Sequence, residues 1–211
     1  MAEEGTINFA YELTAPTSPL LDPGAAAQLS AWRSILRDLD LLGQHPDRYN
    51  GYGYGNVSVL DGKGQIIVTA SQTSAAPELS ESDLTRITGV SFERFWLDAE
   101  GSQPPSSETL THAMCYASDA RLRAVVHVHS PVIWKHAEAL SLPATPPDVA
   151  YGTPAMASAV HQLIERYQTR PLVFVTPGHE DGVFACGAEL GLTTSSLITV
   201  LARARQVERT T

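Results

Sequence analysis

The sequence has little of several features that mark common classes of protein. Among its 211 residues are two cysteines, Cys115 and Cys186, too few for a disulfide framework or a zinc site of four thiolates. Its 14 lysines and arginines are outnumbered by 23 acidic residues, so a nucleic acid or an anionic membrane is not expected as a partner. No window approaches the roughly 20 apolar residues of a membrane span, and the acidic first residues differ from a signal peptide. We therefore expect a cytoplasmic protein.

The length and the 43% content of hydrophobic residues favour one domain with a single core. Residues 1–24 are rich in proline, threonine and serine and show no sustained periodicity. We expect them to form an N-terminal arm that is ordered only where it docks. The remaining residues, 25–211, are expected to form the domain.

Within this domain the hydrophobic pattern alternates between helical and extended periods. Hairpin-like strand pairs are separated by helices, which predicts an α/β fold: a three-layer sandwich of a central mixed, mainly antiparallel sheet covered by helices. The expected helices cover about 25–42, 106–117, 131–140, 154–167 and 188–206, and the expected strands cover 56–60, 65–69, 89–96, 123–129, 172–176 and 182–186.

Seven histidines stand out in this acidic chain, and two of them form a pair on an expected strand. In an extended chain the side chains of His127 and His129 point to the same face. Two neighbouring imidazoles are half of a metal site, although hydrogen-bonded core histidines are an alternative explanation. His179, in a glycine-flanked turn, is the candidate for a third ligand, and the alternative there is a solvated turn histidine.

Two further segments have the chemistry to bind an anion. Ser106, Ser107 and Glu108 precede an expected helix, whose N-terminus favours negative charge, although a simple capped helix start is the alternative. The glycine-rich run at 52–58 allows close backbone approach. It lacks the spacing and the following helix of a nucleotide-binding loop, so nucleotide binding is not expected.

Taken in order, these motifs resemble the class II aldolase/adducin family. The resemblance rests on Gly55–Val59, Ile67–Ser71, Pro105–Glu108 with His112 and Tyr116, Ala124–Ser130, Tyr151–Thr153, and the His179 hairpin with Val183–Cys186. It implies that His127, His129 and His179 bind Zn²⁺ or another divalent metal, and that Glu108 is the catalytic acid/base. It further implies that a substrate phosphate is held by Gly55, Asn56, Ser71, Ser106 and Ser107.

The activity implied by the resemblance is that of a zinc-dependent, aldolase-type lyase. Such an enzyme cleaves or forms a C–C bond in a small hydroxy-carbonyl or sugar-phosphate substrate through an enediolate. An epimerase or a dehydratase on the same scaffold is an alternative, as is a non-catalytic, adducin-like scaffold protein. The resemblance also implies a role in carbohydrate metabolism and a homotetramer with active sites at subunit interfaces.

The chain departs from the family pattern at two places that concern the site. Glu180 and Asp181 separate His179 from Gly182, where the family usually has its ligand histidine directly before the glycine. Asp181 is therefore a rival third ligand or a group behind the ligands. Gln72 stands in the phosphate-binding turn where a glycine is common.

Overall fold

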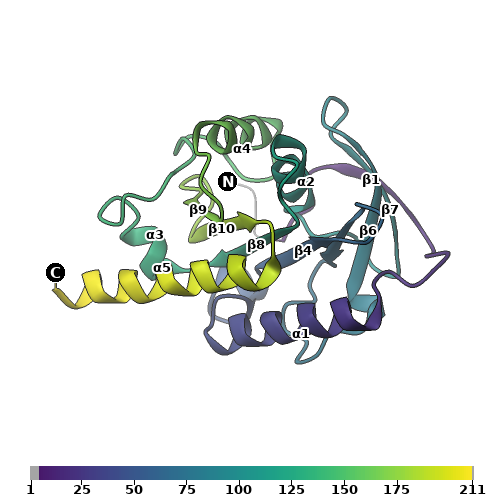
Figure 1. Cartoon of the computed structure of the whole chain (residues 1–211), viewed down its shortest axis with the longest axis horizontal. Coiled ribbons are helices and arrows are strands. Elements are labelled where there is room, and N and C mark those ends of the chain that lie inside the picture. Colours follow the sequence, from purple (N-terminus) through teal and green to yellow (C-terminus); the bar gives the residue numbers. More distant parts are fainter. Residues whose placement is uncertain (1–4, 211) are drawn as a thin grey trace.

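A mixed eight-stranded sheet organises the chain in the computed structural model, which describes residues 5–210 (Figure 1). The strand order is β1-β7-β6-β5-β4-β8-β10-β9, and β1 pairs parallel with β7 while the other neighbours pair antiparallel. This is the predicted mixed, mainly antiparallel sheet. Its strands are β1 (Ala10–Thr14), β4 (Asn56–Leu60), β5 (Ile66–Thr69), β6 (Leu84–Ser91), β7 (Trp96–Gly101), β8 (Ala124–His129), β9 (Leu172–Val175) and β10 (Gly182–Gly187).

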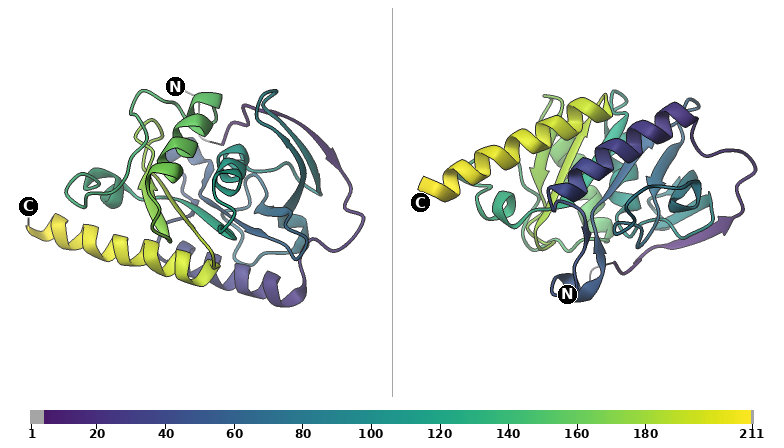
Figure 2. Two further views of the ribbon diagram at one scale, coloured as in Figure 1. Left: turned by 45° about the horizontal axis from the view of Figure 1, so that its top comes forward. Right: turned by 90° about the horizontal axis from the view of Figure 1, so that it is seen from below.

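Helices cover the sheet on both faces, as expected for three layers (Figures 1 and 2). One face is covered by α1 and α5, which lie side by side when the molecule is seen from below, and the other by α2 and α4. Proline and a capping oxygen start two of these helices: the side chains of Asp22 and Thr153 accept hydrogen bonds from the first turns of α1 and α4. The helices are α1 (Pro23–Asp38), α2 (Thr109–Ser118), α3 (Pro131–Lys135), α4 (Pro154–Arg166) and α5 (Leu190–Thr210).

Strand β8 lies in the interior of the sheet, between β4 and β10, and all of its side chains are buried. Alternation sends Val126 and Val128 into the core beneath α1 and α5, and Val125 into the core beneath α2 and α4. His127 and His129 share the parity of Val125, so they face the layer of α2 and α4. No described helix is both long and apolar enough to span a bilayer.

The segment expected to be an N-terminal arm docks onto the sheet. Its residues 10–14 form the edge strand β1, and Leu20 is buried. The buried guanidinium of Arg86 donates hydrogen bonds to the carbonyl oxygens of Pro19 and Leu20, which fixes the connection to α1. Residues 1–4 of the expected arm, and Thr211 at the end of the expected domain, lie outside the described residues.

Three expected element boundaries were wrong. The strand expected at 89–96 is interrupted by the turn at 92–95 between β6 and β7, where Phe95 has φ 53°. Helix α1 ends at Asp38 rather than near Leu42 because Asp40 adopts φ 57° and the Leu41 amide returns to the Leu36 carbonyl, which closes the helix end. Helix α3 ends at Lys135, and turns replace its expected continuation to 140.

Candidate active site

Three histidines from two segments meet at the end of β8. The ligand nitrogens of His127, His129 and His179 all lie within 4.8 Å of one another, and the three side chains are buried. Ring centroids are 5.0 Å apart for His127 and His129, and 4.7 Å apart for His129 and His179. Three imidazoles are a donor set that suits Zn²⁺ and related divalent ions, so the residues present fit the expected metal.

The turn between β9 and β10 brings His179 to the strand histidines. The His179 amide donates to the Thr176 carbonyl at 2.8 Å, and the Gly182 amide donates to the His179 carbonyl at 3.0 Å. Gly182 permits this tight closure, because a Cβ there would lie 2.4 Å from Oγ1 of Thr176 and 3.1 Å from the His179 ring.

Asp181, the rival third ligand, points elsewhere. Its carboxylate accepts a hydrogen bond of 2.7 Å from the Tyr49 hydroxyl. Among the described residues the three-ligand cluster contains His179 and not Asp181. This geometry favours His179 as the third ligand and places Asp181 behind it.

The surroundings of the strand histidines favour the neutral, ligand form of imidazole. Burial, followed by the nearby His179, lowers the pKa of His127 and of His129 well below the usual value. Nδ1 of His127 lies 3.2 Å from the Val183 carbonyl oxygen, and we assign the proton to this nitrogen, because a carbonyl can only accept. Nε2 is then the nitrogen with a free lone pair for the cluster.

Glu108 lies beside the histidines, where the resemblance predicted it. It immediately precedes α2, and its Oε1 is 3.7 Å from Nδ1 of His179. The side chain is 1% exposed and does not cap the helix. The carboxylate therefore points to the imidazole cluster and does not cap the backbone amides of α2.

The residues predicted to hold an anion meet in one small pocket. All five of them line it: Gly55, Asn56, Ser71, Ser106 and Ser107. Other lining residues include Gly5 and Gln72. The Asn56 amide donates to Oγ of Ser106 at 2.7 Å, which joins β4 to the start of α2. Asn56 also pairs with His127 across the sheet, so the pocket adjoins the histidine cluster.

Gly55 has a structural role in this arrangement. It adopts φ +76°, and a Cβ on it would lie 2.6 Å from Cβ of Leu42 and 3.1 Å from the His127 carbonyl oxygen. Only glycine permits both the left-handed backbone and this approach to β8.

Two tyrosines flank the cluster, and the sequence pattern did not assign either of them to it. The Tyr49 ring lies 4.5 Å from that of His129, and the Tyr151 ring stacks on His179 at 4.2 Å between centroids. The Arg48 guanidinium donates to the Tyr49 hydroxyl at 3.0 Å and packs over the Tyr49 ring. The aromatic and glycine-rich run around residues 49–55 was a usable signal, but its partner Asp181 is 132 residues away.

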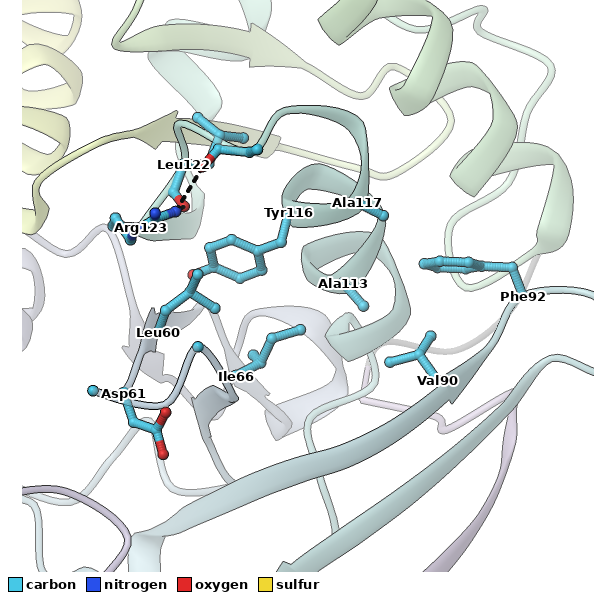
Figure 3. A pocket seen from close by; sticks show the side chains of 13 residues that line it. Leu60, Asp61, Ile66, Val90, Phe92, Ala113, Tyr116, Ala117, Leu122 and Arg123 are labelled. Atoms are coloured by element: carbon cyan, nitrogen blue, oxygen red, sulfur yellow. Dashed lines mark hydrogen bonds between the residues drawn. The ribbon is translucent and has the colours of Figure 1, made fainter.

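The family motif also included His112 and Tyr116, which lie in a buried network beside the cluster, where the Phe184 ring stacks on His127 and contacts His112. The Ser58 hydroxyl is 2.7 Å from Nδ1 of His112 and 2.8 Å from the Tyr116 hydroxyl. The Tyr116 ring faces a separate cavity of about 610 Å³ at the other end of β8, lined largely by apolar side chains with Arg123 at its rim (Figure 3). These two residues therefore support the helix behind Glu108.

Comparison with known proteins identifies the family of the chain. The family model for the class II aldolase and adducin N-terminal domain matches residues 45–206. The chain belongs to this family. A search of curated proteins finds no significant match.

Solved structures of the class II aldolase family share its fold. YgbL of Klebsiella pneumoniae, described as an aldolase/epimerase/decarboxylase, is 18% identical with a TM-score of 0.67, over 90% of this chain and 91% of that one. An L-fuculose 1-phosphate aldolase is 20% identical with a TM-score of 0.66, over 90% of this chain and 87% of the other. The L-fuculose-1-phosphate aldolase of Thermus thermophilus is 22% identical with a TM-score of 0.61, over 86% and 91%. At these identities the likeness concerns the fold.

Proposed function

We propose that this family member is a metal-dependent lyase of the aldolase type, which cleaves or forms a C–C bond in a small hydroxy-carbonyl compound. The observation that carries the proposal is the buried carboxylate of Glu108 beside three converging imidazoles. A buried polar cluster of this kind lowers stability, because its groups lose their hydration and take the place of apolar packing. A scaffold protein has no physical need for it.

Each residue of the site has a part in this proposal. His127, His129 and His179 would hold Zn²⁺ or a related divalent ion, and the lowered pKa values of His127 and His129 keep these two imidazoles neutral at pH 7, each with a lone pair for it. When bound, the ion supplies Lewis-acid stabilisation for the negative charge of an enediolate. Glu108 removes or returns the proton of the reacting hydroxyl, and its burial beside His179 keeps water away from that proton.

The substrate is held in the small pocket that is lined by Asn56 and adjoins the histidine cluster. Ser106 and Ser107 present hydroxyl groups at the start of α2, and Ser71 and Gly55 complete the pocket wall. A substrate bound there places its reactive carbons next to Glu108, because the two serines directly precede this residue in the chain.

Metal analysis tests the first part of the proposal. We expect about one divalent ion per chain after purification, as one three-histidine site implies, and loss of that ion in His127→Ala. His45→Ala is the matched control, because this exposed histidine lies outside the cluster. A wild-type protein that binds no metal, or a His127→Ala variant that keeps it, would refute the metal site and favour a scaffold protein.

Product analysis tests the reaction. A panel of hydroxy ketones and sugar phosphates is incubated with the metal-loaded protein, and the products are separated by chromatography. Carbon–carbon cleavage is expected in the wild type and is expected to be lost in Glu108→Gln with the metal retained. A product of unchanged carbon number would instead indicate an epimerase or a dehydratase on the same residues.

We further propose that the protein works as a cytoplasmic homotetramer with active sites at subunit interfaces. The proposal rests on family membership. Sedimentation equilibrium tests it, and a monomer at micromolar concentration would contradict it.

A further inference from the structure

The pocket beside the histidine cluster is too small for a phosphate group. Its volume is about 10 Å³, near the minimum that one water molecule needs. A phosphate group, with its oxygens arranged around phosphorus, needs more space than one water molecule. The pocket is nevertheless lined with polar groups, so its shape rather than its polarity limits what it holds.

Gln72 fills part of this space at a cost in backbone strain. Its φ is 59°, in the left-handed region that disfavours residues with a Cβ. Gln72 is itself exposed, and its Oε1 accepts a hydrogen bond of 2.9 Å from the amide of Gly53, another residue of the pocket lining. The Gly53 amide, a backbone donor that could face an anion, is therefore already hydrogen-bonded.

The N-terminal segment closes the pocket from the other side. Gly5 is in its lining, and a Cβ built on Gly5 would lie 2.6 Å from Nε2 of Gln72. The same segment passes Gly152, where a Cβ would lie 2.8 Å from Nδ2 of Asn8. The N-terminal segment is anchored by the buried ring of Phe9, which directly precedes β1.

The turn that follows Gln72 is held in place by side-chain hydrogen bonds. The buried guanidinium of Arg33 donates to the carbonyl oxygens of Thr73 at 2.5 Å and Ala76 at 2.6 Å. The Ser74 hydroxyl donates to the Gly55 carbonyl at 2.9 Å. These bonds tie the turn that carries Gln72 to both α1 and β4.

The lining residue Asn56 also carries a buried acceptor next to the pocket. Asn56 is 6% exposed, and its Oδ1 is without a hydrogen-bond partner among the described residues. A buried carbonyl oxygen is stabilised by a donor and destabilised by a dianion. A hydroxyl group supplies the donor, and a phosphate dianion does not.

We propose that Gln72 and residues 5–8 make this pocket a subsite for a small, uncharged, hydroxyl-bearing group, so that the substrate is an unphosphorylated hydroxy-carbonyl compound. This inference rests on the proposed function, since it names the substrate class of that same site. Gln72 is its specificity-determining residue.

The test compares glycolate with 2-phosphoglycolate, which differ only in the phosphate, by isothermal titration of the zinc-loaded full-length protein. We expect the wild type to bind 2-phosphoglycolate no more tightly than glycolate. Gln72→Gly, combined with removal of residues 2–7, should strengthen 2-phosphoglycolate binding by about tenfold or more, because each restored charge-assisted hydrogen bond contributes about 1.5–3 kcal/mol. Glycolate has no phosphate to occupy the opened space, so its affinity should not rise in the same variant.

Two controls accompany the comparison. Ser141→Gly relieves a positive φ of 55° at an exposed residue outside the pocket, so it reports the effect of the backbone change alone. Gln72→Gly in the full-length chain separates the side chain from the segment. Thermal unfolding checks that each variant is folded.

Three results would overturn the inference. One is a wild type that prefers 2-phosphoglycolate by about tenfold, the difference that 1.4 kcal/mol produces. The others are an opened variant with an unchanged preference, and an opened variant that binds neither compound. Failure of the proposed function has a different signature, because glycolate binding would then be the same with and without zinc.

Discussion

The buried histidine His112 makes the stability of the protein depend on pH in a predictable direction. Its side chain is 0% exposed, and burial lowers its pKa to about 3 from an unfolded value near 6.5. Between these two values the unfolded chain binds a proton that the folded chain rejects. The contribution of His112 to stability is therefore fully present above pH 6.5 and is lost as the pH falls toward 3.

The size of this effect follows from proton linkage. Between pH 7 and pH 5 an imidazole of pKa 6.5 in the unfolded chain, and uncharged in the folded one, removes about 2 kcal/mol from the free energy of unfolding. Against a total stability of about 5–15 kcal/mol this is a measurable loss. His127 and His129, whose pKa values burial also lowers, add losses of the same sign in the metal-free protein.

The assay is urea unfolding of the metal-free protein at pH 7 and pH 5, for the wild type and for His112→Asn. Asparagine retains a polar atom near the position of Nδ1, which lies 2.7 Å from Oγ of Ser58. We expect the variant to be less stable at pH 7, because the smaller side chain leaves a cavity. We also expect its loss of stability between the two pH values to be smaller than that of the wild type by about 2 kcal/mol.

Tyr116→Phe is the matched control for this experiment. It removes a hydroxyl group from the same network, and burial raises the pKa of Tyr116 further from the range studied. Its destabilisation should therefore be equal at both pH values. If His112→Asn and the wild type lose the same stability between pH 7 and pH 5, the reasoning from burial to linkage is wrong.

The remaining predictions concern the metal and the turn beneath the pocket. Asp181→Ala should keep the metal stoichiometry of the wild type and His179→Ala should lose it, and elemental analysis showing the reverse would make Asp181 the ligand. Removing the metal with a chelator should lower the free energy of unfolding by about 4 kcal/mol when the free ion had been present at about 1,000 times its dissociation constant, and calorimetry measures this. Arg33→Met should cost about 1–3 kcal/mol in denaturant unfolding, because the Thr73 and Ala76 carbonyls lose their charged, buried donor and keep only the Ala76 amide and the Arg37 guanidinium. An unchanged unfolding midpoint in that variant would show that water replaces the guanidinium.

Local periodicity accounts for the part of the site that the sequence predicted. Strand alternation put His127 and His129 on one face, and the structure has them on one face of β8. The helix start after Ser106 and Ser107 was likewise readable from local residues, and α2 begins at Thr109. Both predictions needed only spacings of a few residues.

The parts that were missed depend on contacts between distant segments. Tyr49 bonds to Asp181, which is 132 residues away in the chain. Both residues have a positive φ, of 50° and 60°, which their residue types do not predict. The edge strand β1 comes from a segment rich in proline and threonine, and it is ordered by pairing with β7 rather than by its own pattern. The turn at 92–95 was predicted as strand because Phe92 and Phe95, at its two ends, and Trp96, directly after it, have high β-propensity.

The register of the sheet also constrains the size of a substrate. Asn56 on β4 is paired with His127 on β8, and neighbouring strands are about 4.8 Å apart. Paired residues of antiparallel strands point to the same face, so the pocket wall and the first imidazole are direct neighbours. A molecule that places its carbonyl at the imidazoles and a hydroxyl group in the pocket therefore needs only a short carbon chain between them. Because both strands are interior to the sheet, this spacing cannot widen without breaking ladder hydrogen bonds, and longer substrates must extend away from the pocket instead.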